Sequence, residues 1–127
     1  MRYTLLIYET AADFAARTNP AAREGYWAAY IAYAQTLQDA GVMVGGTPLY
    51  PPDIATTVRV TGDRREVQDG PFADSKEQLG GYVVIDVADL DAALHWAARC
   101  PGARSGAVEV RPDYPVPGAT ATSEVRG

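Results

Sequence analysis

The chain has 127 residues, of which 47% are hydrophobic and 21% are charged, as in an ordinary globular domain. Its formal net charge of −5, with scattered lysines and arginines, argues against nucleic acid or an anionic membrane surface as the main partner. A single cysteine, Cys100, excludes an internal disulfide, and the first strand-like run is too short for a signal-peptide core. We therefore expect a cytoplasmic protein without a membrane segment.

The N-terminal part predicts a strand followed by a short and a long helix. Residues 3–8, YTLLIY, have the β-branched and aromatic composition of a strand. A capping-box pattern at Thr10 predicts the short helix, and Asn19 followed by Pro20 predicts the start of a long one that closes at Gly41. The expected buried stripe of the long helix, with Tyr26 and Tyr33 at its edges, is Trp27, Tyr30, Ile31, Ala34 and Leu37. Core packing is the main interpretation of this stripe, with a ligand-facing tyrosine as the alternative.

The middle of the chain predicts a short strand, a loop and a hairpin. Residues 42–44 form the strand, and the proline-rich residues 47–53 form a surface loop that could be the lip of a pocket. Alternating residues over 56–61 and a return strand over 66–68 predict the hairpin, with a Gly-Asp turn between them.

The C-terminal part predicts a strand, a second long helix and a final strand. The strand covers residues 81–87, Asp89 caps the helix, and residues 107–111 alternate as the last strand. The expected buried stripe of this helix is Leu90, Ala93, Leu94 and Ala97. Residues 1–113 are thus expected to form one domain, and residues 114–127 a partly disordered tail.

The element order matches an α+β fold of the ferredoxin-like, split βαβ type, with two main helices on one face of the sheet. The strands over 3–8 and 82–87 nevertheless carry apolar residues on both faces. The face without helices would then expose an apolar patch that monomers rarely tolerate. A homodimer packed sheet against sheet would cover this patch.

Residues 69–82, DGPFADSKEQLGGY, are the most distinctive stretch of the chain. On structural grounds, Phe72 is expected to anchor this loop on the core, and Ser75 with Gln78 predicts a single helical turn. On functional grounds, Asp69 is a candidate acid or base, and Arg111 or Lys76 could hold an anionic substrate. The candidate ligand-binding residues are Tyr8, Phe72, Lys76, Glu77, Tyr82 and Arg111.

The sequence predicts neither a metal site nor a bound cofactor. The only histidine, His95, is expected on the exposed face of its helix, so histidine and Cys100 cannot assemble a zinc site. The glycine pairs at 45–46 and 80–81 do not have the spacing of phosphate-binding loops.

The stretch Asp69-Gly70-Pro71-Phe72, with the following ADSKE and GGY segments, resembles the signature of the YCII-related, or DGPF-domain, proteins. The resemblance extends from the N-terminal MRYTLLIY to the VEVRP strand at 108–112. It implies a ferredoxin-like fold assembled as a dimeric α/β barrel.

For activity the resemblance implies two alternatives. Some members of this family are associated with extracytoplasmic-function sigma factors, which implies a ligand-binding or regulatory module with a cleft near the DGPF loop. Other branches are proposed enzymes with a His–Asp pair, including a dehydrochlorinase of chlorinated hydroxyquinols. Asp69 matches only the DGPF pattern, and the histidine of those branches has no counterpart here. The second alternative is therefore a lyase or isomerase that uses Asp69, and the sequence leaves open whether the chain is an enzyme.

Overall fold

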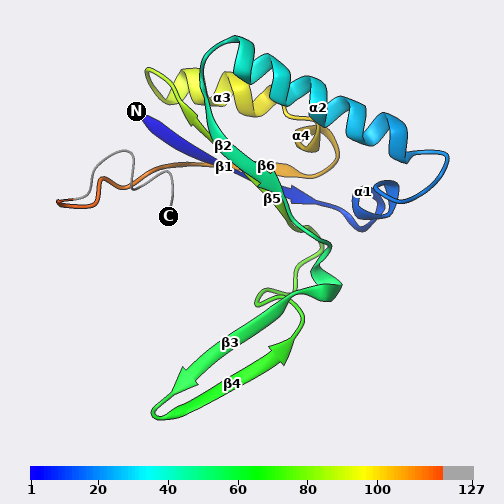
Figure 1. The fold of residues 1–127 in the computed structure, drawn as a ribbon, viewed down its shortest axis with the longest axis vertical. Helices are drawn as coiled ribbons and strands as arrows, with labels where there is room; N and C mark the ends of the chain where they lie inside the picture. Colours follow the sequence, from blue (N-terminus) through cyan, green and yellow to red (C-terminus); the bar gives the residue numbers. More distant parts are fainter. Residues whose placement is uncertain (119–127) are drawn as a thin grey trace.

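The computed structural model describes residues 1–118, so the disorder expected of the tail concerns mainly residues outside this range. Four strands form an antiparallel sheet in the order β2-β5-β1-β6 (Figure 1). These strands are β1 (Arg2–Glu9), β2 (Met43–Pro48), β5 (Gln78–Asp86) and β6 (Ala107–Pro112). This is the order of a split βαβ sheet, which confirms the predicted ferredoxin-like α+β fold.

The helices connect these strands across one side of the sheet. The helices are α1 (Ala11–Ala16), α2 (Arg23–Asp39), α3 (Leu90–Arg99) and α4 (Gly102–Ser105). The two long helices, α2 and α3, lie on the same face, as expected (Figure 1). Thr10 and Asp89 cap α1 and α3 through their side chains, which confirms both predicted starts.

Strand β1 is apolar on both faces, because its side chains alternate between the helices and the uncovered side of the sheet. Tyr3, Leu5 and Ile7 are buried beneath the helices. Leu6 lies between Tyr82 of β5 and Glu109 of β6 on the other side. We call that side the open face; its residues include Thr4, Leu6, Tyr8, Tyr82, Val84, Glu109 and Arg111.

The buried stripe of α2 differs from the prediction. The helix starts at Arg23 instead of Pro20, and Tyr33 and Leu37 are its buried residues. Ile31, expected in the core, is 67% exposed. Tyr33 was predicted at the edge of the stripe, but it is buried. Its hydroxyl donates a hydrogen bond to the Trp96 carbonyl of α3 at 2.7 Å.

The stripe of α3 was predicted half correctly. Ala93 and Ala97 are buried, whereas Leu90 and Leu94 are exposed. The two alanines bring the helix close to the sheet, and the leucines fall to the side of this contact. His95 is exposed, as predicted.

A separate hairpin projects from the end of the sheet (Figure 1). It consists of β3 (Thr56–Thr61) and β4 (Arg64–Asp69), preceded by the 3-10 turn η1 (Pro52–Ile54). We call residues 56–69 the arm. The hairpin was predicted, but its separation from the sheet was not.

The loop from the arm back to β5 does not contain the predicted helical turn. The Ser75 hydroxyl donates to the Glu77 carbonyl at 2.6 Å, and the Gln78 amide donates to the carbonyls of Ala73 and Ser75. These bonds close the loop with side chains in place of helical backbone bonds.

Candidate functional site

A buried ion pair lies where β1 meets α1. Glu9 is the last residue of β1, and Arg17 is the C-cap of α1. Arg17 Nη2 lies 2.6 Å from Glu9 Oε1, and both side chains are less than a tenth exposed. Two opposite charges taken out of water must be paired and hydrogen-bonded to be tolerated.

Tyr26 of α2 completes this polar cluster. Its hydroxyl donates to Glu9 Oε2 at 2.6 Å and accepts from Arg17 Nε at 3.0 Å. Burial and the hydrogen bond to Glu9 raise the pKa of Tyr26 well above its ordinary value, so the phenol stays protonated. Burial lowers the pKa of Arg17, but its bonds to Glu9 and Tyr26 outweigh this effect and raise it.

Arg17 also holds the two chain segments from which the arm departs. It donates to the carbonyl of Leu49, just after β2, and to that of Gly80 in β5 at 2.9 Å. Its guanidinium lies between 4.9 and 5.7 Å from the rings of Phe14, Tyr26 and Trp27. One residue thus ties the base of the arm to the core.

The polar cluster forms one end of a cavity of about 260 Å³ between α2 and the sheet. We call it the interlayer cavity. Its other walls are apolar, with Trp27 and Ile31 on the helix side and Met43 and Val83 on the sheet side. The sheet contributes Gly46, Gly80 and Gly81 to this region, so no side chains from these positions fill the space under α2. The exposed Ile31 marks the rim.

Tyr30 also lines this cavity, and its hydroxyl group is buried. The hydroxyl is next to the Cys100 thiol, and no nitrogen or oxygen within residues 1–118 bonds to it. Burial and the nearby Glu9 raise the pKa of Tyr30. Burial likewise raises the pKa of Cys100, which makes this thiol an apolar core group, as predicted, rather than a nucleophile.

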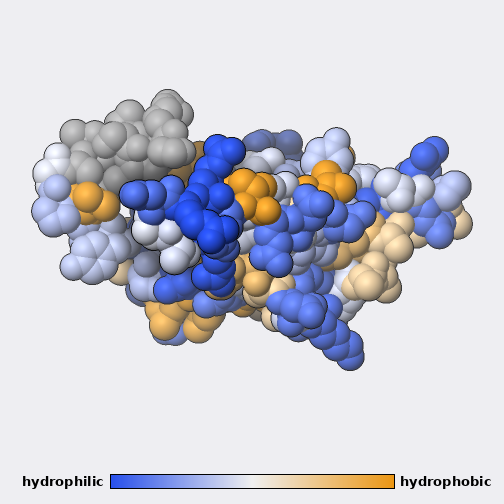
Figure 2. Space-filling model, turned by 90° about the horizontal axis from the view of Figure 1, so that it is seen from below, coloured by the Kyte–Doolittle hydropathy of each residue, from blue (hydrophilic) through white to orange (hydrophobic). Residues whose placement is uncertain are grey.

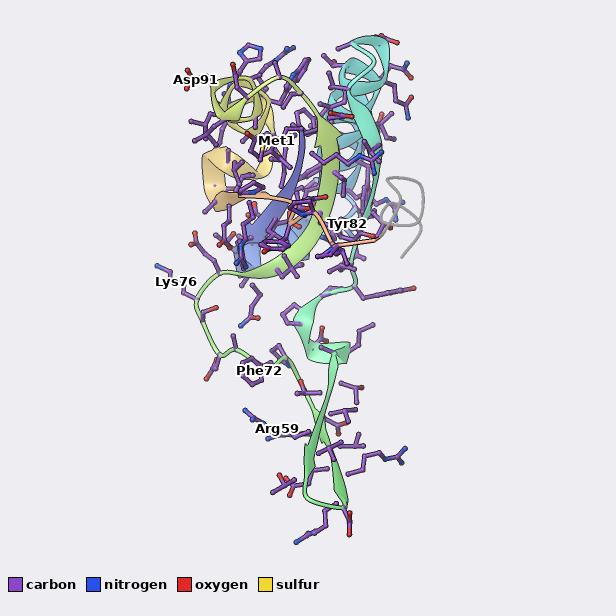
Figure 3. The ribbon with its side chains drawn as sticks, turned by 90° about the vertical axis from the view of Figure 1, so that its left-hand side faces the viewer. Met1, Arg59, Phe72, Lys76, Tyr82 and Asp91 are labelled. Atoms are coloured by element: carbon purple, nitrogen blue, oxygen red, sulfur yellow. The ribbon has the colours of Figure 1, made fainter. Side chains whose placement is uncertain are left out.

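Two of the predicted ligand-binding residues meet on the open face. The Tyr8 hydroxyl donates to Glu109 Oε1 at 3.1 Å, and Arg111 Nε lies 4.0 Å from Glu109 Oε2. Partial burial and the bond to Glu109 raise the pKa of Tyr8. Tyr82 lies on the same face, two strands away from β6 (Figure 3).

The other predicted residues belong to the arm and its loop. Asp69 is exposed at the end of β4, and it lines neither the interlayer cavity nor the hollow at the base of the arm. Lys76 points away from the domain (Figure 3), and Glu77 is half-buried. Phe72 is 74% exposed and lies 4.8 Å from the Arg59 guanidinium, so the prediction that it anchors the loop on the core is wrong.

A second hollow of about 600 Å³ lies between the end of the sheet and the base of the arm. We call it the outer cleft. Tyr8 and Leu79 line it from the sheet, and Tyr50, Pro71 and Phe72 line it from the loops. Leu49 to Pro52 border this hollow, so the middle of the predicted 47–53 loop does form the lip of a pocket. Thr47 and Pro48, predicted in the loop, belong to the end of β2 instead.

The Glu9–Arg17–Tyr26 cluster was not predicted from the sequence. Glu9 continues the alternation of Tyr3, Leu5 and Ile7, so the period of the strand already placed its carboxylate on the buried face. A carboxylate at such a position requires a buried partner, and this was the available signal.

Residues 1–118 contain neither a cluster of metal-binding side chains nor a membrane-spanning helix. No three His, Cys, Asp or Glu side chains of residues 1–118 gather where they could hold a metal ion. No helix in this range is both long and apolar enough to cross a membrane.

Comparisons with known proteins agree with this fold. The model of the YCII-related domain family matches residues 1–116. The uncharacterized protein R00369 of Rhizobium meliloti (strain 1021) is 42% identical over 76 residues, which are 58% of this chain and 61% of that protein. The matched part thus spans less than two thirds of this relative.

A solved structure shares the fold at low sequence identity. It is the 5-chloro-2-hydroxyhydroquinone dehydrochlorinase (TftG) of Burkholderia phenoliruptrix AC1100, in complex with 2,5-dihydroxybenzoquinone. It matches with a TM-score of 0.52 and 15% identity, over 90% of this chain and 94% of that chain. At this identity the likeness concerns the fold alone.

Proposed function

Because this chain belongs to the YCII-related domain family, we propose that it is a homodimeric module that binds a small molecule in the interlayer cavity. One observation carries the proposal: an apolar, aromatic-lined cavity ends at the fixed polar groups of Glu9, Arg17 and Tyr26. Ligand pockets commonly combine apolar walls with a few polar groups that set orientation.

The chemistry of the walls selects the ligand class. Trp27 and Tyr30 offer aromatic faces, and the pKa values of Tyr26 and Tyr30 are both raised, so both phenols stay protonated and uncharged. A planar, uncharged ring with a hydroxyl or carbonyl group fits these walls. The 2,5-dihydroxybenzoquinone in the complex of the dehydrochlorinase is a planar ring with hydroxyl and carbonyl groups, and it supports the choice of ring and substituents.

The proposed dimer buries the open face. Leu6, Tyr82 and Val84 lie side by side on β1 and β5, and no helix within residues 1–118 covers this face (Figure 1). Face-to-face packing of two such sheets would give a dimeric α/β barrel. Two further proposals are a cytoplasmic location and a sigma-factor-related partner. The first rests on the single cysteine and the strand-like N-terminal run, and the second rests on the family resemblance.

A lyase or isomerase with Asp69 as acid or base is the second candidate. It is favoured by the structural neighbour, which is an enzyme, a dehydrochlorinase. In the single chain Asp69 is exposed and lies outside both hollows, so this candidate needs a second chain to enclose the carboxylate. The Asp69→Asn variant tests it: an enzyme should lose turnover and keep its fold and ligand binding. A change in folding or dimer mass alone would make the loop architectural.

Ligand binding is tested by titrating the protein with small phenols and quinones. Binding is measured as a change in Trp fluorescence and as a rise in the melting temperature. Ala34 lines the interlayer cavity, so Ala34→Phe should fill it and abolish binding. Ala28, exposed on the same helix, provides the matched control Ala28→Phe, which should bind as the wild type does. Equal binding by both variants, or no binding by the wild type, would contradict the interlayer cavity as the ligand site.

A further inference from the structure

We propose that the arm of each copy packs its apolar face against the partner copy, so that the outer cleft is completed only in the dimer. The inference rests on the proposed homodimer and extends it to a part of the chain outside the sheet. The occupant of the apolar face is a second copy of this chain.

The two faces of the arm differ in what covers them. On one face the Thr57 hydroxyl donates to the Gly70 carbonyl at 2.8 Å, and Arg59 lies over Phe72, on one side of the arm (Figure 3). This face is turned toward its own loop. On the other face Val58 lies directly opposite Val67, with Val60 two residues further, and all three are more than half exposed.

An uncovered hairpin of this kind needs a partner. Within residues 1–118 each strand of the arm pairs only with the other, so both outer edges carry free backbone groups. A single two-stranded hairpin is at best marginally stable in water. The view from the arm tip shows apolar side chains at the surface among hydrophilic ones (Figure 2).

Charge and position favour a second copy over other partners. The arm carries three arginines and three acidic residues, so its formal charge is zero in a chain of −5. A neutral, valine-faced segment can approach another acidic copy without repulsion, and it lacks the basic charge that nucleic acid or anionic membranes require. The arm also leaves the sheet on the side of the open face (Figure 1). Its six-residue strands are ~20 Å long, so the arm can reach a partner that is packed on the open face.

The outer cleft is continuous with these surfaces. Tyr8 belongs both to the open face and to the cleft, and Phe72 links the cleft to the arm. A partner on the open face therefore supplies the missing wall. Asp69 lies opposite Thr56, on the same face of the arm as Val58 and Val67, so the dimer would turn its carboxylate toward the partner.

Sedimentation velocity over a wide concentration range tests the arm with the double variant Val58→Asp/Val67→Asp. We expect the dimer dissociation constant to rise by at least ~tenfold, because charged groups would replace the buried centre of the contact. The matched control is Thr61→Asp on the opposite face of the same strand, which should leave the constant within ~twofold. Leu6→Asp on the open face should dissociate the dimer independently.

Hydrogen exchange on the wild-type protein tests the contact without any substitution. Amides of residues 56–69 should be protected when the protein is dimeric and should exchange rapidly after dilution, while β1 amides stay protected in both states. A monomeric wild type would overturn the dimer and the arm contact together. A dimer that Leu6→Asp dissociates, but whose arm is unprotected and indifferent to Val58→Asp/Val67→Asp, would overturn the arm contact alone.

Discussion

The Glu9 carboxylate and the Arg17 guanidinium meet at 2.6 Å inside the domain, where both are almost completely removed from water. Arg17 also donates to Leu49 and Gly80, on either side of the segment that includes the arm. The pair therefore does more than neutralise charge, because it joins the first strand, the end of the interlayer cavity and the base of the arm.

Arg17→Met should lower the free energy of unfolding by about 3–5 kcal/mol, because it leaves the Glu9 carboxylate buried without its partner. Urea denaturation followed by circular dichroism measures this change. Arg23→Met, at an exposed position in the first turn of α2, is the matched control and should stay within about 0.5 kcal/mol of wild type. A similar small effect at Arg17 would show that the pair contributes little.

Gly80→Ala should destabilise the fold by about 1–3 kcal/mol, because a β-carbon at this position would overlap with the Glu9 carboxylate. Gly25→Ala should have the opposite effect on stability. Gly25 lies in α2 with open space around it, so alanine should stabilise the helix by about 0.5–1 kcal/mol. Thermal or urea unfolding of the two variants should shift in opposite directions, and a Gly80→Ala protein as stable as wild type would contradict the close contact.

Stability should fall at alkaline pH through the buried tyrosines. Burial raises the pKa of Tyr26, Tyr30 and Tyr33 above the ordinary value of 10.0. Above about pH 10 the unfolded chain releases these protons while the folded chain retains them, so the folded state loses stability as pH rises. Below that pH the full contribution is present.

Urea unfolding at a series of alkaline pH values measures this slope. Tyr26→Phe removes one of the shifted groups and should flatten the loss of stability, whereas Tyr114→Phe, at an exposed position, should keep the wild-type slope. If the unfolding free energies of wild type and Tyr26→Phe fell equally with pH, the ionisation of Tyr26 would not be linked to folding.

Cys100 should react very slowly with a disulfide reagent such as dithionitrobenzoate in the native protein. It is buried, and burial raises its pKa, so both access and thiolate are lacking. The same chain in concentrated urea should react at the rate of a free thiol and serves as the internal control. Fast labelling under native conditions would mean that the core around α3 and α4 opens readily.

Much of the architecture was readable from local patterns. The alternation and composition of residues 3–8 and 81–87, together with caps at Thr10 and Asp89, were sufficient to predict the element order and the split βαβ sheet. These signals are local, because strand period, helix caps and turn residues depend on near neighbours in the chain. The DGPF stretch likewise identified the family.

Other features depend on contacts between distant segments, and only the tertiary structure decided them. The rotation of α2 that buries Tyr33 and exposes Ile31 follows from its packing against α3. The Glu9–Arg17–Tyr26 cluster joins residues from β1, α1 and α2, and the sequence does not indicate that these three side chains are partners. The separation of the arm, which leaves Asp69 and Phe72 outside the core, depends on where β2 and β5 pair, and a local pattern carries no information about that pairing.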